Sequence, residues 1–136
     1  MTAPDLYAVY LAAYNRVATD SAGSAVRAAL GTTASVIEVD DLKKSLPALP
    51  LLAFQGGGID PSEYDADDLP FGWWIYDSPL YRYDRINQVF TLARALYPHD
   101  WLANSFTTLM SSPKEQPDGA ANLPVRSIWW KVSKRQ

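Results

Sequence analysis

The chain has 136 residues, of which 48% are hydrophobic and 20% are charged, a balance typical of one globular domain and not of a linker or a fibre. The absence of cysteine excludes disulfides, thiolate nucleophiles and cysteine-ligated metal centres. A single histidine, His99, excludes multi-histidine metal sites, and the net charge of −3 argues against a broad phosphate-binding face.

The N-terminal part of the chain predicts two helices. Thr2 is a candidate N-cap with Asp5 three residues later, and apolar residues then recur at helical spacing over about 16 residues. These residues are Leu6, Val9, Tyr10, Ala13 and Val17. Asp20 and Ser21 can cap a second, short helix, which we expect to stop at Gly31.

Three strands are predicted next. Residues 35–39 include the β-branched Val36 and Ile37 and favour a short strand. Residues 49–54 are apolar at every position, which is typical of a strand covered on both faces. An acidic loop, about 56–70, then separates this strand from an aromatic strand over residues 71–76.

The clearest helical pattern follows the aromatic strand. We expect Ser78 to cap this helix with Pro79 at its first position, and Pro98 to stop it. Its apolar face consists of Ile86, Val89, Phe90, Ala93, Leu96 and Tyr97. Asp100 is a candidate cap for one further turn around Trp101.

The C-terminal part predicts two strands, over residues 106–110 and 125–132, joined by a proline-rich loop over about 111–124. The resulting order is helix, short helix, three strands, helix and two strands. Strand runs interrupted by one helix favour an α+β fold, with a mostly antiparallel sheet and helices packed on one face. We expect residues 1–136 to form a single domain.

Charge is unevenly distributed along the chain. Six acidic residues and no basic residue lie between Asp60 and Asp77, whereas only basic residues carry charge after Asp118. One interpretation is a solvated acidic loop and a solvated basic tail. The other is a pair of complementary patches on neighbouring copies of the protein.

Several motifs that resemble chemical sites are incomplete. The triple glycine at 56–58 is not followed by the Gly-Lys-Ser/Thr of a phosphate-binding loop, and the acidic stretch lacks the ordered spacing of an EF-hand. Asp100 can orient His99, but no Gly-x-Ser-x-Gly elbow supplies a nucleophile. We therefore predict no catalytic, cofactor-binding or metal-binding residue.

Two tryptophan pairs, Trp73-Trp74 and Trp129-Trp130, fall on predicted strands. Successive strand side chains point to opposite faces, so one tryptophan of each pair must leave the helix-covered face. Either the sheet is covered on both sides, or these tryptophans lie at a subunit interface.

We expect the protein to be made in the cytoplasm, because no basic and apolar leader is present. We also expect no membrane association. The longest apolar stretch, residues 46–54, is interrupted by two prolines and is far shorter than the roughly twenty residues of a membrane span.

The succession of motifs along the chain has a recognisable layout. Pro50-Leu51-Leu52-Ala53-Phe54 precedes the acidic loop, Trp73-Trp74-Ile75-Tyr76-Asp77-Ser78-Pro79 leads toward Tyr83 and Arg85-Ile86-Asn87, and Ala95-Leu96-Tyr97-Pro98 ends the helix. This layout resembles the tail-terminator, or tail-completion, proteins of long-tailed bacteriophages, small α+β subunits that form a ring at the head-proximal end of the tail tube. The triple glycine and the length of the acidic loop depart from that layout.

The resemblance implies a structural virion protein without enzyme activity or cofactor. It implies a self-assembled ring, commonly hexameric, with tail-tube subunits below it, neck or connector proteins above it, and DNA passing through its lumen without specific binding. An acidic loop facing that lumen would repel DNA. As interface residues we expect Asp65, Asp67, Asp68, Trp73, Trp74, Arg126, Trp129, Trp130 and Lys131.

Three other functions stay open at this point. A head–tail connector subunit of the same neck would share ring formation but bind a different neighbour. A small-ligand or carbohydrate-binding module would use exposed tryptophans as stacking surfaces. A hydrolase would be built around His99 and Asp100.

Overall fold

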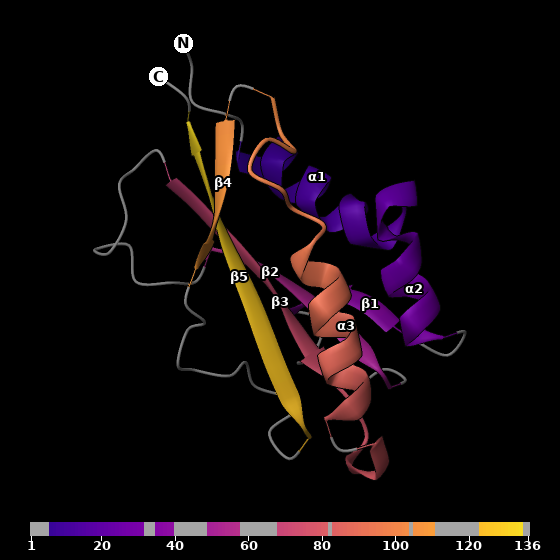
Figure 1. Ribbon diagram of the computed structural model, residues 1–136. Coiled ribbons are helices and arrows are strands. Elements are labelled where there is room, and N and C mark those ends of the chain that lie inside the picture. Colours follow the sequence, from indigo (N-terminus) through magenta and orange to yellow (C-terminus); the bar gives the residue numbers. More distant parts are fainter. Residues whose placement is uncertain are drawn as a thin grey trace.

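One mixed five-stranded sheet organises the fold (Figure 1). This computed structural model describes residues 6–31, 35–39, 49–57, 68–81, 83–103, 105–110 and 123–134. The elements are α1 (Leu6–Ala18), the 3₁₀ turn η1 (Ser21–Gly23), α2 (Ser24–Leu30), β1 (Ser35–Glu38), β2 (Leu51–Gly56), β3 (Asp68–Tyr76), the 3₁₀ turn η4 (Pro79–Tyr81), α3 (Asp84–Arg94), β4 (Ser105–Met110) and β5 (Val125–Lys134).

The strands lie in the order β1-β2-β3-β5-β4. Only β1 and β2 run parallel, and each other neighbouring pair is antiparallel. β5 therefore lies inside the sheet, paired with β3 along the whole length of β3 and with β4 on its other side. The predicted α+β class with a mostly antiparallel sheet is confirmed.

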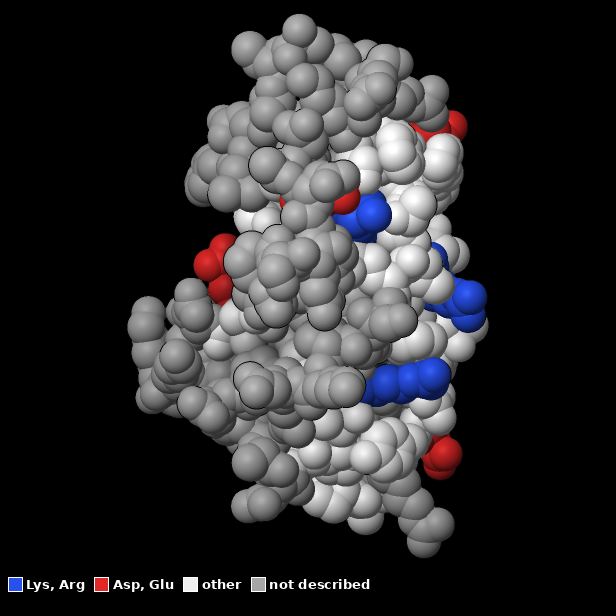
Figure 2. Space-filling model, turned by 90° about the vertical axis from the view of Figure 1, so that its left-hand side faces the viewer, with Lys and Arg blue, Asp and Glu red and all other residues white. Residues whose placement is uncertain are grey.

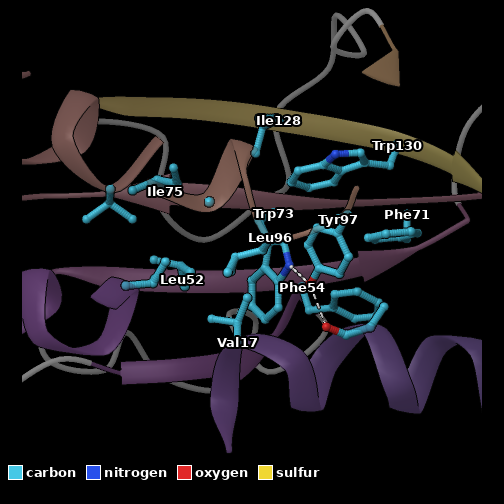
Figure 3. Packing of buried hydrophobic residues seen from close by; sticks show 14 of the residues in the cluster. Val17, Leu52, Phe54, Phe71, Trp73, Ile75, Leu96, Tyr97, Ile128 and Trp130 are labelled. Atoms are coloured by element: carbon cyan, nitrogen blue, oxygen red, sulfur yellow. Dashed lines mark hydrogen bonds between the residues drawn. The ribbon is translucent and has the colours of Figure 1, made fainter. Parts of the chain in front are cut away.

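The three α-helices pack on one face of the sheet. Strand alternation turns Phe71, Trp73 and Ile75 of β3 toward the helices, where they share a core with buried residues of α1, α2 and α3 (Figure 3). The intervening positions of β3 face the other way. There a second, smaller cluster contains Leu51, Ala53, Trp74, Tyr76 and Trp129.

Polar contacts fasten α1 to the rest of this core. The Tyr97 hydroxyl accepts a hydrogen bond from Trp73 Nε1 (3.0 Å), and both residues are labelled in Figure 3. The same hydroxyl donates a hydrogen bond to the Ala13 carbonyl (2.5 Å). Arg16 donates to the Leu96 carbonyl, and the Tyr10 hydroxyl donates to the Pro70 carbonyl (3.0 Å). Burial raises the pKa of Tyr97 strongly, and it also raises that of Tyr10, because the phenolate loses its hydration.

Two predicted boundaries are wrong. α3 begins at Asp84 and not at Pro79, because residues 79–81 form η4, where the Ser78 hydroxyl accepts the Leu80 N–H (3.2 Å). The helix ends at Arg94, and the chain around Trp101 makes turns without a further helix.

The acidic loop is also shorter than predicted. β2 continues to Gly56, and β3 begins at Asp68, so the two ends of the expected loop, 56–70, belong to strands. The candidate cap Thr2, most of the acidic loop and most of the proline-rich loop fall outside the described residues. None of the described helices combines the length and apolar composition needed to cross a bilayer.

Candidate interaction surface

All four paired tryptophans are buried, with exposed fractions of 5% or less. The prediction that one of each pair leaves the helix-covered face is confirmed, since Trp74 and Trp129 belong to the second cluster. The interpretation that these tryptophans lie exposed at a subunit contact is wrong. The sheet is covered on both faces instead, and none of the four rings offers a stacking surface for a sugar.

On the helix side, Trp73 and Trp130 build the aromatic centre of the core (Figure 3). Trp130 stacks on Phe71 with ring centroids 5.4 Å apart, and Trp73 bonds to the Tyr97 hydroxyl. Their partners come from the same sheet and from the turn that follows α3. Both residues therefore contribute to the core. The alternation of side chains along a strand does not by itself distinguish a core residue from an interface residue.

On the opposite side, Trp74 and Trp129 meet edge to face with centroids 6.2 Å apart. Trp74 Nε1 donates to Gln55 Oε1 (2.8 Å), whereas Trp129 Nε1 has no hydrogen-bond partner among the described residues. The Trp129 ring lies directly over Gly72, where a Cβ atom would come within 2.3 Å of it. Glycine is required at position 72 because the indole occupies the place of a side chain.

The acidic and basic segments meet within one chain. Asp68 accepts a hydrogen bond from Ser133 Oγ (2.7 Å) and lies 3.6 Å from Lys131 Nζ. Antiparallel pairing places Asp68 directly opposite Ser133, which explains the contact. Asp68 and Lys131 therefore contact each other within the chain, and their role in a contact between copies stays a prediction. Asp65 and Asp67 lie outside the described residues.

Among the predicted interface residues that the structure describes, Arg126 is the exposed one. Its guanidinium lies over the Phe90 ring, 3.7 Å from the ring centroid, and its Nη1 donates to Asn87 Oδ1 (2.7 Å). We call Arg126 with Asn87 and Phe90 the arginine platform. A stacked guanidinium keeps free donors on its edge while its orientation is fixed, an arrangement suited to a carboxylate or phosphate.

The described basic side chains do not form a broad patch on the face seen in Figure 2, where they are spaced along one margin. Such spacing favours single contacts with acidic groups over binding along a nucleic-acid backbone, which requires many phosphate contacts. The low positive charge density agrees with the net charge of the chain.

The turn that joins β3 to α3 is closed by a buried ion pair. Asp77, fully buried, accepts Arg85 Nε (2.7 Å) and Arg85 Nη2 (2.6 Å). Asp77 Oδ1 also accepts the Ser78 N–H (2.7 Å). This pair was not predicted from the sequence. The available signal was an acidic residue at the end of a predicted strand, followed by an arginine eight residues later.

The other candidate sites take structural roles. The His99 ring stacks on Phe106 with centroids 5.5 Å apart, and the His99 carbonyl accepts the Thr107 N–H (2.9 Å). Gly57 has a φ of 77° and donates its N–H to the Pro70 carbonyl (2.9 Å), so it closes the end of β2. Within the described ranges, no group of three or more acidic or histidine side chains is placed to hold a metal ion.

Comparison with known proteins gives no relative from which a function can be taken. No protein-family model, curated protein or solved structure matches the chain.

Proposed function

We propose that this protein is a structural subunit of the tail-terminator type, which assembles with copies of itself into a ring at the head-proximal end of a phage tail. It acts without enzyme activity or cofactor, and it meets tail-tube subunits on one side and neck proteins on the other. The layout of motifs from β2 to the end of α3 supports this assignment.

The arginine platform is the observation that carries self-assembly. Asp68 and Lys131 pair within the chain, and Arg126 stays exposed in a fixed orientation. The chain itself supplies the matching charge, since residues 60–68 contain five acidic and no basic side chains. A contact between Arg126 of one copy and a carboxylate of the next joins two different surfaces, and such heterologous contacts close into a ring when the rotation between copies allows it.

The two sheet edges support the same geometry. β1 is joined to the sheet by parallel pairing and β4 by antiparallel pairing, so the two edges differ in direction and in side chains. Contact between one edge of a copy and the other edge of the next would join two unlike surfaces, as head-to-tail association requires.

The test is the native mass in solution, measured by light scattering over a range of protein concentrations, with electron microscopy of the assembled fraction. We expect a discrete multiple of 15.1 kDa, open rings in projection, and weaker association as salt rises. Arg126→Gln should raise the concentration needed for assembly about tenfold, the equivalent of about 1.4 kcal/mol.

Arg94→Gln is the matched control, because Arg94 is also an exposed arginine and lies at the end of α3, outside the arginine platform. It should assemble like the wild type. A wild-type monomer of 15.1 kDa at every concentration and salt would refute self-assembly, and compact dimers in place of rings would refute the ring.

A further inference from the structure

The turn between β3 and α3 carries the most exposed large apolar side chain among the described residues. Leu80, on η4, is 81% exposed, and Tyr83, just before α3, is 50% exposed. Single apolar side chains on a surface are common, so exposure alone does not indicate a binding site. The way in which this turn is held and what lies beside it carry the argument.

Hydrogen bonds hold the first part of this turn. The Asp77–Arg85 pair joins the residue before the turn to the second residue of α3. Asp77 also accepts the Ser78 N–H, and the Ser78 hydroxyl accepts the Leu80 N–H. Removing a carboxylate from water is costly, so the pair adds less net stability than its short contacts suggest. Because the Leu80 backbone is already bonded to Ser78, it loses less entropy when the Leu80 side chain binds a partner.

The turn is continuous with the arginine platform. Tyr83, Asn87 and Phe90 are spaced four and three residues apart, so they follow one face at the start of α3. Asn87 and Phe90 hold Arg126. Tyr83 and the arginine platform therefore share one face of α3, and Leu80 lies on η4, the 3₁₀ turn that precedes this helix.

We infer that Leu80 and Tyr83 are the apolar anchor through which this chain binds a second copy of itself, beside the carboxylate contact of Arg126. This inference rests on the proposed self-assembly. The occupant is a second copy because the anchor adjoins the cationic platform and this chain carries the complementary acidic stretch.

The composition of the surface fits such a contact. Protein interfaces concentrate affinity in a few aromatic, arginine and well-packed apolar side chains, with polar groups around them. A charged contact alone is screened by salt and gives specificity more than affinity. Leu80 and Tyr83 supply the salt-resistant part of the contact.

The experiment compares Leu80→Ser and Tyr83→Ser with Leu11→Ser, a matched control on α1 whose leucine is 44% exposed. Native mass is measured by light scattering at low salt and at about 1 M salt, where charges are screened beyond roughly 3 Å. We expect wild type to keep part of its association at high salt. Leu80→Ser should associate at least about tenfold more weakly at low salt and lose the residual association at high salt, while Leu11→Ser should match wild type.

Leu80→Met keeps the apolar surface and should associate like wild type. Far-UV circular dichroism of each variant checks that it is folded. Wild-type association by Leu80→Ser and Tyr83→Ser at both salt concentrations would overturn the inference, as would an equal loss in Leu11→Ser. In either case a shift in Arg126→Gln would leave the proposed self-assembly standing. A wild type that is monomeric throughout would remove the proposed function itself, and the anchor with it.

Discussion

The buried pair of Asp77 and Arg85 predicts an unequal response to removing either partner. Asp77 is fully buried, whereas the Arg85 side chain is 24% exposed. Breaking a buried ion pair costs about 3–5 kcal/mol because an unpaired charge stays behind. Asp77→Asn leaves a guanidinium that water can reach, so its cost should lie near 3 kcal/mol or slightly below. Arg85→Gln leaves a carboxylate without access to water, so its cost should lie near 4–5 kcal/mol.

The double variant gives the strength of the pair. Because Asn and Gln leave no stranded charge, the combined cost should fall short of the summed costs by about 2 kcal/mol or more. The measurement is urea unfolding followed by tryptophan fluorescence, which reports on the buried indoles of both faces. Equal costs for the two single variants, or a coupling below about 0.5 kcal/mol, would refute the assignment of Asp77 as a buried, ionised partner.

Two further changes test the packing on each face of the sheet. Gly72→Ala brings a methyl group within 2.3 Å of the Trp129 ring, so urea unfolding should show a loss of about 1–3 kcal/mol in the free energy of unfolding. The loss should be smaller in a Trp129→Phe background, and an equal loss in both backgrounds would contradict the close approach. Tyr97→Phe strands Trp73 Nε1 and the Ala13 carbonyl and should cost about 2–3 kcal/mol at neutral pH. Burial raises the Tyr97 pKa in the folded state, so the unfolded state loses this proton first, and wild-type stability should fall as pH rises above the ordinary value of 10.0. Tyr97→Phe should lose less stability than wild type over that alkaline range, and parallel pH profiles for the two proteins would exclude Tyr97 as a cause.

Local patterns in the sequence predict the elements of this fold well. The apolar stripe of α3 is found at Ile86, Val89 and Ala93, all buried, because helical periodicity is a property of neighbouring residues. The start of α3 could not be predicted in the same way. Ser78 and Pro79 form a favourable helix start, yet the Arg85 side chain binds Asp77, and Pro79–Tyr81 form a 3₁₀ turn.

The arrangement of the candidate surface depends on contacts between distant parts of the chain. Lys131 meets Asp68 because β5 pairs with β3, and nothing in either segment indicates that pairing. Arg126 reaches Phe90 only once β5 lies beneath α3. The charges were visible in the composition, but whether each serves its own chain or a neighbour is decided by strand order and register.

The burial of both tryptophan pairs illustrates the same limit. Alternation along β3 and β5 assigns each indole to a face, and both assignments are correct. Alternation does not say whether the second face is covered. The all-apolar run in residues 51–54 of β2, with Leu51 and Ala53 in the second cluster, was the signal that favoured a sheet buried on both sides.

The interior position of β5 sets the order of events during synthesis. β3 and β4 do not pair with each other, and both wait for a strand that leaves the ribosome after them. Until residues 125–134 emerge, one edge of β3 stays unpaired. Its aromatic side chains also stay exposed to other nascent chains. The growing polypeptide therefore passes through a stage at which unpaired strands and large apolar side chains are available for misassembly. Closure of the sheet by its last strand ends that stage in one cooperative step, and a translational pause just before Val125 would prolong it.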